Sequence, residues 1–265
     1  MANAPTADRA LLPQAEPAVR RIGTAEIRAA LARGWEDFRA NPTQLVFLAL
    51  IYPLVGIVAA TAAAGRDLMP LVWPLASGFA LVGPVAALGV YELSRRRERG
   101  LPTSWLNAFD VLRSPALPSI LALGLMLVAI FAAWIVAAQA IYRATFGGYV
   151  PATIGEFAWR LFNTAEGWQL ILIGNGVGFL FAVAVLMLTV VSFPMLLDRP
   201  ELGAGAAVRT SVRAVLANPG PMALWGLVVA LLLALGSLPF FVGLAVAVPV
   251  LGHATWHLYR AVVAE

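Results

Sequence analysis

The chain contains no cysteine and no lysine, and charged residues make up only 12% of its 265 residues. Without cysteine the chain can form no disulfide, no thiolate metal site and no cysteine-ligated iron–sulfur cluster. Soluble domains carry about 25% charged residues, so the low charge excludes an ordinary soluble domain. All 18 basic residues are arginine, and the formal net charge is +4.

Apolar residues, by contrast, are abundant: they make up 61% of the chain, and the mean hydropathy is +0.84. These values indicate an all-α, polytopic membrane protein with a single membrane domain at 24–265. The arginine excess is best explained by membrane topology and anionic lipid, and we expect no nucleic-acid partner. Residues 1–23 are rich in alanine and proline and lack an apolar core, so we expect a mobile cytoplasmic tail without a cleavable signal.

The organising stretch of the sequence is 70–100, an apolar run of about twenty residues, long enough to cross a bilayer, that ends in an arginine cluster. Pro74 and Pro84 lie inside the run and predict a kinked helix. The cluster places its end at a membrane surface, on the cytoplasmic side.

Six transmembrane helices follow from the apolar runs, together with three cytoplasmic interfacial helices that carry an apolar and a polar face. The spans are expected at 43–64, 69–93, 117–141, 168–197, 222–235 and 240–262, and the surface helices at 24–40, 103–113 and 205–216. In the surface helix 24–40, Thr24 is expected as the N-cap and Asp37 on the polar face. Thr153 and Glu156 have the spacing of a capping box, which predicts a small outer helix.

The order of these segments suggests a triplicated unit of one surface helix and two spans, at 24–93, 101–197 and 203–263. In each unit a proline, Pro42, Pro115 or Pro219, follows the surface helix. All arginines except Arg66, Arg143 and Arg160 fall in segments assigned to the cytoplasm. This bias predicts an even number of spans with both termini in the cytoplasm.

The arginine cluster supplies the first candidate site, a lipid or partner contact made by Glu92, Arg95, Arg96, Arg97 and Arg99. The plainer interpretation is a helix end anchored by arginines that extend to the membrane surface.

Two weaker candidates lie in the later spans. His253 and His257 share one helix face, but two imidazoles do not complete a metal site, and polar interfacial residues are the plainer interpretation. Asn175, with Gly174 and Gly178, forms a candidate intramembrane polar site, either on a substrate path or in helix packing. No ionisable residue lies convincingly at mid-membrane, which argues against ion-coupled transport.

The stretch 70–100 resembles a bacterial family of predicted integral membrane proteins of unknown function, some of which are labelled as cytochrome c oxidase subunits. The residues that carry the resemblance are Pro70, Pro74, Gly78, Phe79, Gly83, Pro84, Gly89, Tyr91, Glu92, Ser94, Arg95 and Arg96, with Gly34, Trp35, Phe38 and Pro42 upstream. The resemblance implies a protein of the bacterial inner membrane, and it implies no activity. A catalytic oxidase subunit needs six metal-binding histidines, and this chain has only two.

The sequence contains no catalytic motif and many packing features, so the leading hypothesis is a non-catalytic scaffold or accessory subunit of a larger membrane complex, without a cofactor. Its expected partners are membrane lipids, some of them anionic, and other membrane subunits. The alternative is a transporter or channel for a neutral or lipidic solute. A third hypothesis, a membrane enzyme, requires Glu92, Asp110 and the histidines to converge on one pocket.

Overall fold

The computed structural model describes residues 16–43, 46–47, 49, 51–52, 56, 70–79, 81 and 83–264. Most of the expected first span and most of the expected tail lie outside these residues. The described part is all-helical, as the composition predicts, and its β structure is limited to one bridge between Val19 and Val263.

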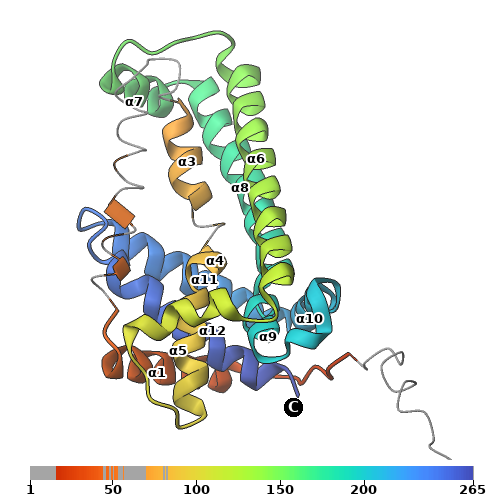
Figure 1. Cartoon of the computed structure of the whole chain (residues 1–265). Coiled ribbons are helices and arrows are strands. Elements are labelled where there is room, and N and C mark those ends of the chain that lie inside the picture. Colours follow the sequence, from red (N-terminus) through yellow and green to blue (C-terminus); the bar gives the residue numbers. More distant parts are fainter. Residues whose placement is uncertain are drawn as a thin grey trace, which may run out of the picture.

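Two long helices, α6 (Leu117–Phe146) and α8 (Ala165–Thr189), stand side by side and form the upright part of the molecule (Figure 1). The helix α7 (Ile154–Asn163) crosses one end of this pair. Thr153 caps α7 as expected, because its Oγ1 accepts a hydrogen bond from the backbone N–H of Glu156 at 3.1 Å.

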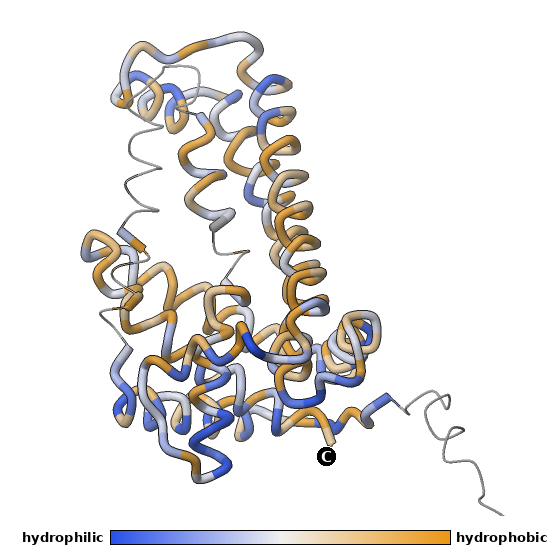
Figure 2. Tube along the Cα trace, viewed as in Figure 1, coloured by the Kyte–Doolittle hydropathy of each residue, from blue (hydrophilic) through white to orange (hydrophobic). Residues whose placement is uncertain are grey.

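Three segments of the described residues are long and apolar enough to cross a membrane: Leu117–Phe146, Ala165–Asp198 and Pro219–Ser237. They agree with the third, fourth and fifth expected spans, and Figure 2 shows the upright helices as mainly apolar. The expected sixth span corresponds to α12 (Leu244–Val262), which is not among them. Its second half carries both histidines and Arg260, and these lower its hydropathy.

Where the sequence predicts one kinked helix over 69–93, the structure has three pieces: α3 (Val72–Phe79), α4 (Gly83–Ala86) and α5 (Leu88–Glu98). A proline removes a backbone donor and clashes with the preceding turn, and a glycine weakens a helix. Gly83 and Pro84 supply both effects at the start of α4. Arg95, Arg96 and Arg97 are part of α5 itself, and Arg99 is its C-cap.

The helix α1 (Thr24–Ala40) packs along α12 at the opposite end of the molecule from α7. A Cβ at Gly34 would lie only 2.6 Å from the backbone nitrogen of Ala254, so the glycine permits this close approach. Two expectations for α1 need correction. The helix begins at Thr24, with Gly23 in the N-cap position, and the carboxyl group of Asp37 is buried instead of facing water.

Shorter elements complete this end of the molecule: the 3₁₀ helices η4 (Trp105–Arg113) and η5 (Pro200–Leu202), and the α-helices α9 (Ser192–Asp198), α10 (Gly203–Ala217) and α11 (Pro219–Ser237). The junction at Asn218 and Pro219 separates α10 from α11 where the sequence predicts a break.

The last residues of the expected tail run beside the C-terminus. The N–H of Arg20 donates to the carbonyl oxygen of Val262 at 2.7 Å, and the N–H of Ala264 donates to that of Ala18 at 2.9 Å. The Asn218 side chain also holds this segment, since its Oδ1 accepts from the N–H of Ile22 at 2.8 Å. Residues 16–22 are therefore tied to the helical body.

Candidate functional site

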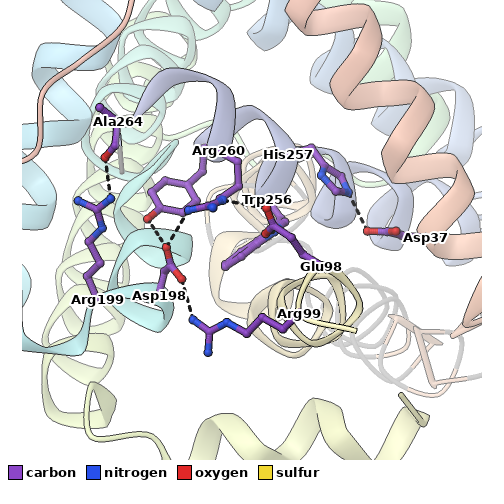
Figure 3. A network of polar contacts seen from close by, with 10 residues as sticks. Asp37, Glu98, Arg99, Asp198, Arg199, Trp256, His257, Arg260 and Ala264 are labelled. Atoms are coloured by element: carbon purple, nitrogen blue, oxygen red, sulfur yellow. Dashed lines mark hydrogen bonds and ion pairs between the residues drawn. The ribbon is translucent and has the colours of Figure 1, made fainter. Parts of the chain in front are cut away.

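The ends of α1, α5, α9 and α12 meet in a dense set of polar contacts, part of which Figure 3 shows. We distinguish two groups. The histidine cluster consists of Asp37, Ser94, His253 and His257. The arginine network consists of Glu98, Arg99, Asp198, Tyr259 and Arg260.

In the histidine cluster, two of the three hydrogen bonds are made to one carboxylate oxygen, Oδ2 of Asp37. Oδ2 of Asp37 accepts a hydrogen bond from Oγ of Ser94 at 2.6 Å, and Nε2 of His257 lies 2.8 Å from it. Oγ of Ser94 also lies 2.7 Å from Nδ1 of His253. The side chain of His253 is fully buried. Three helices far apart in the sequence are thereby joined through one buried hydrogen-bond chain.

The protonation state of the cluster follows from the charge on Asp37. Burial opposes ionisation of this carboxyl group, but the hydrogen bonds from His257 and Ser94 outweigh burial, so the pKa of Asp37 lies below its ordinary value. Asp37 is therefore a carboxylate at neutral pH and accepts hydrogen bonds from both partners.

The tautomer of His253 is then determined as well. A hydroxyl group has one hydrogen, and Ser94 gives it to Asp37. Nδ1 of His253 must then carry a hydrogen and donate it to Oγ of Ser94, which leaves Nε2 as an acceptor. Among the described residues, this buried Nε2 has no hydrogen-bond partner.

The arginine network ties helix ends together. Asp198, at the end of α9, accepts hydrogen bonds from Nη2 of Arg99 at 3.0 Å, the hydroxyl of Tyr259 at 2.8 Å and Nη1 of Arg260 at 3.3 Å. Glu98, at the end of α5, accepts from Nε of Arg260 at 3.0 Å and from the indole N–H of Trp256 at 2.9 Å. Figure 3 shows these side chains converging between α5, α9 and α12.

The five residues of the predicted lipid or partner contact are engaged inside the chain. Glu92 is 2% exposed and pairs with Nη2 of Arg95 at 2.7 Å, while Nη1 of Arg95 donates to the carbonyl oxygen of Leu197 at 2.6 Å. The other three arginines pair with Asp110, Asp37 and Asp198; these pairs are Arg96–Asp110 at 3.1 Å, Arg97–Asp37 at 3.4 Å and Arg99–Asp198 at 3.0 Å.

The predicted intramembrane site lies on an open face of α8. The side chain of Asn175 is exposed, and its Nδ2 donates to the carbonyl oxygen of Ile171 in the same helix at 2.7 Å. A Cβ at Gly174 or Gly176 would meet nothing within 4 Å, whereas one at Gly178 would lie 3.1 Å from the Trp134 ring.

The convergence that the enzyme hypothesis requires is not found. Glu92 pairs with Arg95, Asp110 bonds to Arg96 and Asn107, and neither is bonded to a histidine. Within the described part of the chain, no group of three or more histidine, aspartate or glutamate side chains is arranged to hold a metal ion.

Sequence reasoning identified the histidines but missed Asp37 and Ser94, their hydrogen-bonding partners. No spacing pattern links residues on three helices. The only signal in the sequence was that Ser94 follows the apolar run of 70–93 and that Asp37 lies near the end of the surface helix 24–40, both at segment ends assigned to the cytoplasmic side. His257 also borders a cavity of about 340 Å³ between α1 and α12, lined mainly by alanines with Glu26 and Arg33.

Residues 72–198 match the model of a family described as "Predicted integral membrane protein (DUF2189)". This match confirms the family of unknown function that the sequence resembles, and it covers α3 to α9. The chain matches no curated protein and no solved structure. The protein is thus an integral membrane protein with apolar helices, and the family that its residues 72–198 match carries no assigned catalytic activity.

Proposed function

We propose that this protein is a non-catalytic scaffold or accessory subunit of a larger inner-membrane complex, with α8 as a contact surface for a partner helix. The observation that carries the proposal is the exposed amide of Asn175 on a candidate span. An amide facing hydrocarbon is costly unless it is hydrogen-bonded, and interhelical bonds of this kind contribute about 0.6–2 kcal/mol.

The surface around Asn175 suits a close helix contact. Gly174 and Gly176 leave open space beside the amide, and small residues let helix backbones approach each other. The Nδ2 of Asn175 already bonds to its own helix, but Oδ1 is available as an acceptor for a partner's donor.

The ion pairs and hydrogen bonds among the charged groups at these helix ends support a structural role over catalysis. The acidic and basic side chains at the ends of α5, α9 and α12 bond to one another and to helix carbonyl oxygens. Such a network fixes helix ends in place. It leaves little free chemistry for a substrate.

The proposal includes six spans with both termini in the cytoplasm, so that the arginine network faces the cell interior. The apolar side chains of η4 support a position at the membrane surface. Four of them are exposed on this amphipathic helix: Trp105, Leu106, Phe109 and Leu112.

Co-purification from native membranes in mild detergent tests the proposal. The wild-type chain should retain a recurrent membrane partner, and N175L should retain about five-fold less of it, as expected for the loss of about 1 kcal/mol. N163L is the matched control, because Asn163 is also exposed and its Nδ2 makes the same local bond, to Trp159, but lies on α7 outside the spans.

Recovery of the wild-type chain as a solitary monomer would contradict the proposal. An equal loss of partner in N163L and N175L would also contradict it, because the effect would not then come from the span. A neutral solute transported by the purified chain in vesicles would favour the transporter hypothesis instead.

A further inference from the structure

Among the arginines near the candidate spans, Arg143 differs from the cluster on α5. It lies in the last turn of α6, its side chain is exposed, and no other described residue pairs with it. Gln139 is exposed one turn earlier on the same helix and has no recorded hydrogen-bond partner. The two side chains occupy one face of α6 because residues four apart are neighbours on a helix.

Both residues line one cavity of about 180 Å³. Its other walls come from the start of α3 at Pro70 and Leu71, from Tyr142, and from the loop after α6, which includes Tyr149. The cavity lies at the α7 end of the upright helices, opposite the arginine network (Figure 1).

We propose that this cavity binds the phosphate of an anionic phospholipid, held by the guanidinium of Arg143 and the side-chain amide of Gln139. A guanidinium presents paired N–H donors that match phosphate oxygens, and an amide adds a further donor. The inference does not depend on the proposed function, because it concerns α6 and lipid, and the partner contact concerns α8.

The cavity lies at the level along the membrane normal where lipid headgroups are expected. Trp159 on α7 and Trp168 on α8 are both exposed near this end, and tryptophan is enriched where a bilayer meets water. The apolar side chains Ile154 and Phe162 of α7 are exposed too. A phosphate beside Arg143 would therefore lie at the level where these rings place the headgroups.

The described charged groups near the cavity, Arg160 and Glu156, are engaged with other partners than Arg143. The neighbouring Arg160 stacks on Tyr149, with its guanidinium carbon 4.0 Å from the ring centroid. The carboxylate of Glu156 accepts hydrogen bonds from the hydroxyl of Tyr149 and from the N–H of Ala152. The bond to Glu156 raises the pKa of Tyr149, so the phenol stays neutral. The carboxylate of Glu156 thus has its own donors.

The contrast with the α5 arginines strengthens this assignment. Arg95 and Arg99 already pair with Glu92 and Asp198, so a lipid phosphate there would have to displace an existing ion pair. At Arg143 it would break no ion pair with a described residue, which makes this cavity the better phosphate site.

Native mass spectrometry of the detergent-purified chain tests the proposal with three probes: phosphatidylglycerol, a diacylglycerol with the same acyl chains, and inorganic phosphate. The wild-type chain should bind phosphatidylglycerol at least ten-fold better than diacylglycerol, which lacks the phosphate. R143Q should lower phosphatidylglycerol binding about ten-fold, and Q139L should lower it by a smaller factor. R113Q is the control, since Arg113 is 88% exposed at the other end of the molecule.

Equal binding of the two lipids would overturn the proposal, as would an equal loss in R113Q and R143Q. Binding of inorganic phosphate that depends on Arg143, without binding of phosphatidylglycerol, would assign the cavity to a free anion and overturn the lipid assignment. Helix content and the thermal midpoint of R143Q should match the wild type, because Arg143 makes no ion pair with any residue that the structure describes.

Discussion

Replacing Ser94 by alanine tests the hydrogen-bond chain that joins α1, α5 and α12. The substitution removes the hydroxyl that donates to Asp37 at 2.6 Å and that lies 2.7 Å from Nδ1 of His253. A hydrogen bond to a charged group contributes about 1.5–3 kcal/mol, and a buried donor left without a partner costs about 1–3 kcal/mol. With partial relaxation of the site, S94A should lower the free energy of unfolding by about 2–5 kcal/mol.

The assay is reversible unfolding by SDS in mixed micelles, followed by tryptophan fluorescence and by circular dichroism. S237A serves as the control, because Ser237 makes only a local hydrogen bond to the carbonyl oxygen of Leu233 at 2.8 Å. Its loss should cost about 0.5 kcal/mol. The double variant S94A/D37N should be less destabilised than the sum of the single variants, because both remove the same bond.

One hydrogen bond contributes about 1 kcal/mol to stability. The reasoning would be refuted if the unfolding free energies of S94A and S237A differed by less than about 0.5 kcal/mol. Strict additivity in the double variant would refute it too. Either result would mean that the proton of Ser94 does not link Asp37 to His253, and the assigned tautomer would be wrong.

Three further predictions concern the fold. G34A should lower the free energy of unfolding by at least about 1–3 kcal/mol in the same assay, because the new methyl group would clash with the Ala254 backbone. G176A should be neutral or slightly stabilising, because Gly176 lies at an open position of a helix. The pKa of Asp37 is lower in the folded chain than in the unfolded chain. The carboxylate therefore stabilises the fold fully above about pH 4, and this stabilisation is lost as the pH falls through the folded-state pKa. The unfolding free energy of D37N should change less than that of the wild type between about pH 5 and pH 2. T153A should remove the cap of α7 and make the loop before it about 1 kcal/mol easier to open, which hydrogen exchange at Glu156 would detect.

Much of the fold could be predicted from local signals. Apolar runs of span length locate α6, α8 and α11, and the Asn218–Pro219 pair locates the start of α11. Thr153 identifies the beginning of α7. These signals depend on residues within one or two helical turns, and neighbouring helices change them little.

The interruptions and the histidine cluster could not be predicted in the same way. Proline and glycine indicate that 69–93 bends, but the packing of Gly89 on Ala108 and of Gly252 on Val90 determines where α5 lies. Asp37 is one residue before Phe38 in an amphipathic pattern, and that pattern assigns it to water. Its burial depends on Ser94 and His257, which meet it only in three dimensions.

The position of the arginine network connects the fold to the expected triplicated unit, which stays a prediction. The last helices of the three expected units are α5, α9 and α12, and their ends meet in this network. Helix C-termini carry partial negative charge and unpaired carbonyl oxygens, so their convergence requires cations. Arg95 donates to the carbonyl oxygen of Leu197, and Arg199 donates to that of Ala264. R95Q should loosen the contact between α5 and α9, and R199Q should loosen the contact between the end of α9 and the chain after α12. Limited proteolysis should then cut between α9 and α10 in both variants.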